Sequence, residues 1–282
     1  MRKTLVNVSN RTSTERITGA KLPGSFLNPT KKEVEFMKLP RHFARRTLFS
    51  IWFFITAIIG LAAAPGRSAD EIPFSKAKII IEFNATGNDV GVQVLLDGDP
   101  WKRLKIESPN GRKILDITAS GSLKKQGLTE LFFESSEPTL DEVPLAEFLA
   151  RFPEGEYEFE GKTVEGDELE GTATLTHVIP AGPVIVSPQN GAVVDPNSLV
   201  IDWEPVTETI TGSQGITIVG YQVVVDGGNP SRRFDVTLAA LTTSVKVPPE
   251  FLEPDTEYTF EVLAIEAGGN QTITEGEFVT QP

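Results

Sequence analysis

The chain has 282 residues, contains no cysteine, and carries 26 Lys and Arg side chains against 39 Asp and Glu. A chain of this length can form two domains of ordinary size, and without cysteine it forms neither disulfides nor a thiolate metal site. Residues 1–69 hold 12 of the basic but only 3 of the acidic side chains, so the remainder has a net charge of −22. Because nucleic-acid binding relies on Lys and Arg displacing counterions from phosphates, this acidic remainder excludes nucleic acid as a partner.

Residues 37–69 have the plan of a secretory signal peptide. Basic side chains follow Met37, an uncharged apolar run of 17 residues covers positions 48–64, and small residues come next. This order is typical of a signal that is cleaved during export, and we expect cleavage after Gly66 or Ser68. The run is also at the lower length limit for a membrane-spanning helix. The alternative is therefore an uncleaved anchor, through which the chain would contact a membrane.

Residues 1–36 show no sustained helix or strand period, and they precede a better start at Met37. We expect this stretch to be disordered or to lie before the true initiator. The signal pattern and the acidic, cysteine-free composition favour a bacterial source. The expected location is the periplasm, the cell envelope or the exterior.

The C-terminal region, residues 181–282, is predicted to be a β-sandwich. It contains about seven short strand-like runs separated by turn signals, as an all-β sandwich does. The clearest runs are residues 198–203, 216–226, 234–238, 242–247, 258–264 and 275–280.

Several aromatic residues in this region lie at characteristic positions. Trp203 ends one strand, Tyr221 lies in the next, and residues 252–264 read L-x-P-x-T-x-Y-x-F-x-V-x-A with Tyr258 at the strand start. A tyrosine there can bury its ring while its hydroxyl bonds the preceding backbone. In these features the region resembles the fibronectin type III family. The resemblance implies a sandwich that serves as a spacer, an adhesion module or an accessory to carbohydrate enzymes.

The central region, residues 70–179, is predicted to be a second, mostly β domain with one short helix. Residues 144–152 place Leu145, Phe148, Leu149 and Phe152 at helical spacing behind a proline. A short Pro- and Gly-containing linker at residues 179–183 predicts a restricted geometry between the two domains. The expected strands are residues 78–83, 90–96, 104–107, 113–118, 128–134, 157–164 and 169–178.

Tyr157 repeats the pattern around Tyr258. Residues 153–159 read P-x-x-E-Y-x-F, and residues 254–260 read the same. A shared tyrosine corner predicts that the central domain is also immunoglobulin-like. The expected fold class is therefore all-β, with an immunoglobulin-like sandwich in front of the C-terminal one.

Asp97 and Asp99 lie on a glycine-containing segment, with Asp89 nearby in the sequence. Carboxylates two residues apart can converge on Ca²⁺, which takes several oxygen ligands. The same Asp-Gly pattern is common in hairpin turns. We therefore consider a calcium site at Asp89, Asp97 and Asp99, with a plain turn as the alternative; no other cofactor is expected.

Trp101 and Arg103 follow this segment directly. An exposed Trp101 beside basic groups would form a platform for a sugar or a peptide, whereas a buried Trp101 would anchor the core. Arg103 belongs to a basic set whose members form either a solvated face or a docking surface for acidic groups. The set is Lys102, Arg103, Lys105, Arg112, Lys113, Lys124 and Lys125.

Catalysis is not expected. The sequence contains no G-x-S-x-G, H-E-x-x-H, phosphate-loop or dinucleotide motif, and we interpret His177 as a structural histidine on a strand. The expected function is that of a non-catalytic exported binding or scaffold protein with a protein or glycan partner. A carbohydrate-binding protein, with or without Ca²⁺, is the first alternative, and a two-carboxylate hydrolase is the second.

Overall fold

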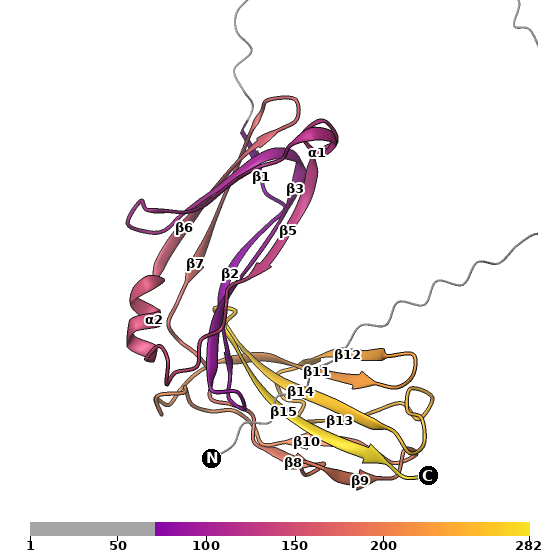
Figure 1. The fold of residues 1–282 in the computed structure, drawn as a ribbon. Coiled ribbons are helices and arrows are strands. Elements are labelled where there is room, and N and C mark those ends of the chain that lie inside the picture. Colours follow the sequence, from indigo (N-terminus) through magenta and orange to yellow (C-terminus); the bar gives the residue numbers. More distant parts are fainter. Residues whose placement is uncertain (1–70) are drawn as a thin grey trace, which may run out of the picture. The chain divides into compact units, whose positions relative to one another are not determined.

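The computed structural model describes residues 71–282 (Figure 1). The predicted signal peptide and the stretch before it, residues 37–69 and 1–36, lie outside the described residues. No helix among residues 71–282 is long and apolar enough to cross a membrane. The described residues form one compact unit with a central half, up to about residue 179, and a C-terminal half.

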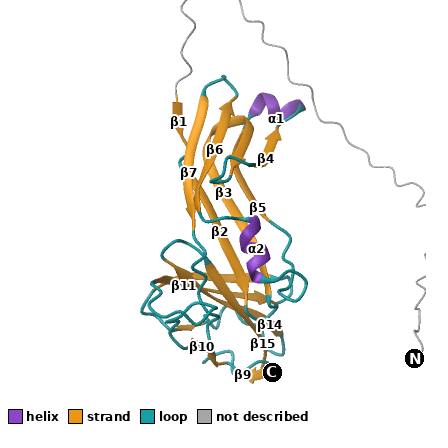
Figure 2. Cartoon of the chain, turned by 90° about the vertical axis from the view of Figure 1, so that its left-hand side faces the viewer, coloured by secondary structure: helices purple, strands orange, loops and turns teal. Residues whose placement is uncertain are grey.

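The central half is mostly strands with two short helices, shown in purple in Figure 2. Helix α2 was expected, and α1 was not. The expected strands are present, with shifted boundaries. The elements are β1 (Glu71–Pro73), β2 (Lys76–Asn84), β3 (Asp89–Glu107), β4 (Lys113–Thr118), α1 (Gly121–Gln126), β5 (Leu128–Glu134), α2 (Leu145–Arg151), β6 (Gly155–Thr163) and β7 (Glu168–Leu175).

Strand β3 is one long strand where the sequence predicted two strands and a turn. Its first part pairs with β2 and β5, and its second part pairs with β4 and β6. The register shifts between Asp97 and Trp101. The Gly and Pro of the expected turn therefore lie in a β-bulge, where proline is tolerated within a sheet.

The core of the central half is largely aliphatic. Alternate residues of β2, Ile79 and Ile81, point inward and are fully buried, as strand geometry requires. The expected amphipathic helix is present as α2: Phe148 is buried, and its apolar neighbours pack against the same core. Burying these side chains removes apolar surface from water, which is the main stabilising term of the half.

The C-terminal half is a sandwich of two sheets. Strands β15, β14, β11 and β12 are neighbours in one sheet, while β13, β10 and β8 form the other. All six strands named from the sequence are present. The elements are β8 (Ile185–Ser187), β9 (Ala192–Val194), β10 (Val200–Trp203), β11 (Ile218–Gly227), β12 (Arg232–Ala239), β13 (Ser244–Lys246), β14 (Glu257–Glu266) and β15 (Gln271–Thr280).

The two halves share a sheet, which the sequence did not predict. Strand β15 lies beside β2 (Figure 1) and pairs with it in parallel. In this register Gln271 lies opposite Glu82, and Ile273 lies opposite Asn84. The linker at residues 179–183 is therefore only one of the connections between the halves.

Asn270 is the main polar link at this junction. Its side chain is buried, its Oδ1 accepts a hydrogen bond from the Ile81 backbone N–H at 2.8 Å, and its Nδ2 donates to the Thr176 and Val178 carbonyls, both at 2.9 Å. Ile210, from the loop after β10, packs against the central core. Backbone pairing, a buried amide and an apolar contact together restrict movement between the halves.

Candidate functional site

A groove with a volume of about 440 Å³ lies where the shared sheet passes from one half to the other. We call it the acidic groove after six of its lining residues: Glu82, Glu134, Glu137, Asp235, Glu261 and Glu275. The rest of its lining is apolar or neutral, apart from Arg233. The other lining residues are Asn84, Gln93, Phe132, Gln222, Val224, Arg233, Leu263 and Ile273.

Strand alternation brings these side chains to one face. Residues 79, 81 and 83 of β2 point into the central core, so Glu82 points to the opposite face. In the C-terminal half, Asp235, Val224, Glu261 and Glu275 lie side by side across four neighbouring strands. The shared sheet joins these two sets of side chains into a single surface.

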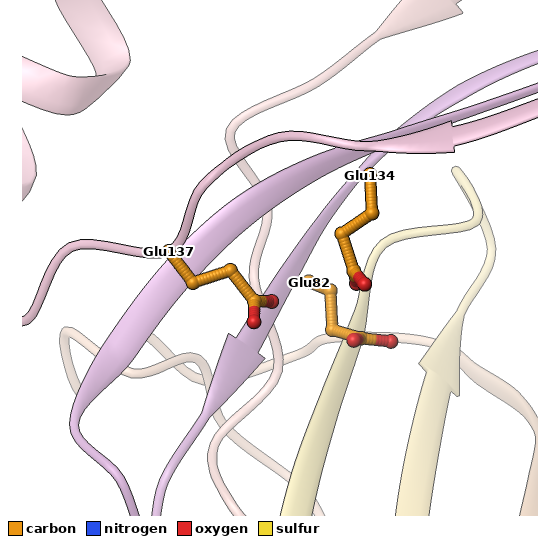
Figure 3. A group of neighbouring side chains, drawn as sticks. All are labelled: Glu82, Glu134 and Glu137. Atoms are coloured by element: carbon orange, nitrogen blue, oxygen red, sulfur yellow. The ribbon is translucent and has the colours of Figure 1, made fainter.

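Three carboxylates meet at the central end of the groove (Figure 3). Glu82 comes from β2, Glu134 from the end of β5 and Glu137 from the segment after it, and one oxygen of each lies within 4.8 Å of the others. Gly91 on β3 leaves room for this approach, because a Cβ there would lie 2.8 Å from Cγ of Glu137. Oxygens this close can hold a shared proton or a hard cation such as Ca²⁺.

Glu82 has the most perturbed ionisation of the three. It is 7% exposed and accepts a hydrogen bond from Nε2 of Gln271. Burial, reinforced by repulsion from Glu134 and Glu137, raises the pKa of Glu82 to about 7 despite the hydrogen bond from Gln271. Near neutral pH this side chain is therefore divided between its acid and carboxylate forms.

Two further acids of the groove also have raised pKa values. Burial and then repulsion from Glu134 raise the pKa of Glu137, while burial and then repulsion from Glu275 raise the pKa of Glu261. Glu261 and Glu275 lie directly opposite each other on β14 and β15, and like charges so placed are destabilising. Within residues 71–282, none of the six acidic side chains makes a salt bridge.

A second carboxylate group lies on the outer surface, formed by Glu107, Glu158 and Glu160. Here Lys105 Nζ is 2.9 Å from both Glu107 and Glu160. An ammonium already pairs with two of these three carboxylates, so the groove cluster is the stronger candidate for a cation.

The three residues considered for calcium do not form one site. Asp89 and Asp97 lie eight residues apart on β3, which separates their backbones by about 26 Å along a strand. Asp99 lies with Asp97 at the bulge, and both are exposed. Asp89 is instead close enough to Glu137 to raise the pKa of that side chain.

Trp101 is fully buried in the central core. Its ring is therefore not an exposed platform for a sugar or a peptide, and Trp101 has the other role that we considered, that of a buried core anchor. Arg103, two residues on, is exposed and makes two hydrogen bonds to Asp116 at 3.1 and 2.9 Å. Lys105 and Lys113 also pair with acids of their own half, so this part of the basic set forms a solvated, internally paired face.

The four aromatic residues predicted as structural are all buried. The rings of Trp203 and Tyr221 lie 5.3 Å apart, and the Tyr221 hydroxyl accepts a hydrogen bond from the Val206 N–H at 2.9 Å. Tyr258 accepts one from the Glu253 N–H at 2.8 Å. Tyr157 donates one to the Pro153 carbonyl at 3.1 Å, and its burial raises its pKa to about 12.

Two ionisable residues differ from what the sequence indicated. His177 follows β7 instead of lying on a strand, and its Nε2 is 2.8 Å from the Phe152 carbonyl oxygen. Glu82, which we did not single out from the sequence, is buried and has a raised pKa. The local signal for Glu82 was an acid within the apolar run of residues 78–83, where strand alternation sets it on the face away from the core.

Comparison with known proteins supports the interpretation of the C-terminal half. Residues 186–280 match the family described as "Fibronectin type III domain". The chain is similar to the FN1–FN3 domains of chicken CNTN1, with 12% identity, a TM-score of 0.32 and coverage of 76% of this chain and 69% of that one. It is also similar to a two-domain fibronectin type III segment of chicken tenascin, with 13% identity, a TM-score of 0.27 and coverage of 72% and 97%. No curated protein matches the chain. By the family match and its own aromatic anchors, the segment 186–280 is a fibronectin type III domain.

Proposed function

We propose that this chain is a non-catalytic, exported binding or scaffold protein that presents the acidic groove to a protein partner. Fibronectin type III domains are commonly protein-binding or scaffold modules and are typically non-catalytic. One observation carries the proposal: the walls of the groove come from both halves, and β2 and β15 hold those halves in one sheet. A groove held in place before binding avoids the entropic cost of ordering it on contact.

Photocrosslinking tests the binding surface. Phe132 lines the groove with 59% of its surface exposed, whereas Leu241, in the turn between β12 and β13, is 97% exposed and outside the groove. We would replace each in turn with a photoreactive phenylalanine analogue in the native host. Discrete adducts at position 132 and none at position 241 are expected. Identical adduct patterns at both positions would refute the groove as the binding surface.

Export is tested separately, by fractionating the host and sequencing the N-terminus of the recovered protein. We expect the protein outside the cytoplasm, beginning just after Gly66 or Ser68. A product that keeps residues 37–69 and sediments with membranes would replace cleavage with anchoring. A product found in the cytoplasm would contradict export altogether.

A carboxylate-dependent hydrolase is the second candidate, and Glu82 is the observation that favours it. An acid with a pKa of about 7 beside other carboxylates can act as a general acid. Turnover of a glycoside panel by the unmodified chain, lost in Glu134→Gln but kept in Glu156→Gln, would establish the hydrolase in place of the scaffold.

A further inference from the structure

Neighbouring negative charges in the acidic groove repel one another. Glu261 and Glu275 lie directly opposite each other, Glu134 and Glu137 crowd Glu82, and Arg233 makes its salt bridge to Asp226 instead of to a groove acid. Repulsion of this kind is relieved when a positive charge enters. The groove therefore favours a cationic occupant.

The spread of the charges fixes the size of that occupant. The acids extend from Glu134 on β5 to Asp235 on β12, with β3, β2, β15, β14 and β11 between these strands. Six spacings of about 4.8 Å give a span of roughly 29 Å measured along the surface of the sheet. A single ion with ligands at about 2.5 Å can engage only one corner of such a site. Charges distributed over this span fit an occupant that carries several positive groups along its length.

The surface between the charges indicates the kind of cation. Val224 and Leu263 lie on the groove floor, each 5% exposed, and Phe132 stands at the β5 end with its ring largely in solvent. Lys and Arg side chains place their methylene stems on apolar surface while their charged ends remain hydrated. An exposed aromatic ring also attracts a cation to its face.

We propose that the acidic groove binds an extended, lysine- or arginine-rich segment of a partner protein, about nine residues long at about 3.3 Å per residue. This inference rests on the proposed function and specifies the chemistry of its partner. Opposite charge favours the ionised form of a carboxylate, so binding displaces protons from the groove. Affinity therefore increases as the pH is raised through neutrality, and it decreases with added salt.

The test measures binding of a fluorescent nine-residue peptide of alternating Lys and Val to the full chain by anisotropy, with a Glu–Val peptide as the probe control. The variant Glu261→Gln/Glu275→Gln removes two groove charges. The control variant Glu156→Gln/Glu170→Gln removes two charges at exposed positions on β6 and β7. We expect the groove variant to weaken binding by at least about tenfold and the control variant by less than about twofold.

Equal weakening in the two variants would reduce the interaction to non-specific attraction and overturn the inference. Loss of affinity without loss of fold is checked by thermal unfolding, in which the groove variant should be at least as stable as the parent because it removes a repulsive pair. Saturable Ca²⁺ binding with no peptide binding would also overturn it, in favour of a metal site. If position 132 still gives discrete photoadducts while the Lys–Val peptide does not bind, the inference fails and the proposed function remains.

Discussion

The central half and the C-terminal half each bury one tryptophan and one tyrosine, but different residues surround this pair in the two halves. Each has a fully buried tryptophan, Trp101 or Trp203, followed later by a tyrosine at the start of a strand. In the C-terminal half these residues belong to a set of packed aromatic rings that includes Tyr221 and Phe278. In the central half they lie among aliphatic strands, and α2 contributes Phe148. Both halves thus bury a tryptophan and a strand-start tyrosine, although different residues fill the space around them.

The two tyrosine corners also differ in how the hydroxyl is used. Tyr258 accepts from a backbone N–H, whereas Tyr157 donates to a backbone carbonyl. A backbone N–H has one hydrogen to offer, while a carbonyl has two lone pairs. The same sequence pattern thus supports the chain before the strand in two different ways.

The strongest test of the comparison removes each tryptophan in turn. Trp101→Ala and Trp203→Ala should each lower the free energy of unfolding by about 3–5 kcal/mol, because each leaves a large cavity. If the shared sheet makes the halves cooperative, calorimetry will show one transition in both variants. Leu241→Ala, at an exposed turn, should change stability by less than about 0.5 kcal/mol. Separate transitions in Trp101→Ala would mean that the halves unfold independently.

Asn270→Ala tests the junction itself. The variant leaves the Ile81 N–H and the Thr176 and Val178 carbonyls without their partner. Loss of these buried hydrogen bonds should cost about 2–3 kcal/mol, and it should split or broaden the calorimetric transition. Asn197→Ala removes an amide from an exposed turn and should leave the transition unchanged. An unaltered single transition in Asn270→Ala would show that strand pairing and the Ile210 contact couple the halves without the amide.

Glu82→Gln tests whether the raised pKa of Glu82, on the groove side of the junction, makes stability depend on pH. The folded-state pKa of about 7 exceeds the ordinary value of 4.5, so the folded state retains a proton that the unfolded state loses, and stability falls as the pH rises between these values. Gln carries no charge, so the variant should be about 2 kcal/mol more stable than the parent at about pH 8 and little different below about pH 4.5. Denaturant unfolding at both pH values measures the difference, with Glu156→Gln as control. A pH-independent difference would mean that the ionisation of Glu82 is ordinary.

The smallest effect is expected from the tyrosine hydroxyls. Tyr258→Phe leaves an N–H without its partner and should cost about 1–2 kcal/mol. Tyr157→Phe removes a donor from a carbonyl and should cost less than about 1 kcal/mol. Denaturant midpoints of the two variants, measured side by side, give the order. The reverse order would show that the two corners are not distinguished by donor and acceptor roles.

The C-terminal half was predictable because its signals are local. Trp203, Tyr221 and Tyr258 each lie within a short run that specifies a strand. In the central half, the helix around Phe148 was predictable for the same reason, because its apolar spacing is set within a few residues. The course of β3 was not predictable, because Asp97–Pro100 has the residue types of a turn. The strand stays continuous there because the residues before and after this stretch pair with other strands. The groove was missed for a similar reason: Glu82 and Glu275 come from opposite ends of the described chain, and only the pairing of β2 with β15 brings them together.

The pairing of β2 with β15 can form only after the ribosome has made β15, near the end of the chain. Ile81 and Asn270 are 189 positions apart, and at about 5–20 residues per second the ribosome needs roughly 10–40 s to make the chain between them. Until β15 emerges, the edge of β2 at residues 82–84 has no partner, and an unpaired strand edge is a site of association with other chains. A nascent chain of this protein therefore exposes this edge of β2 until β15 has been made.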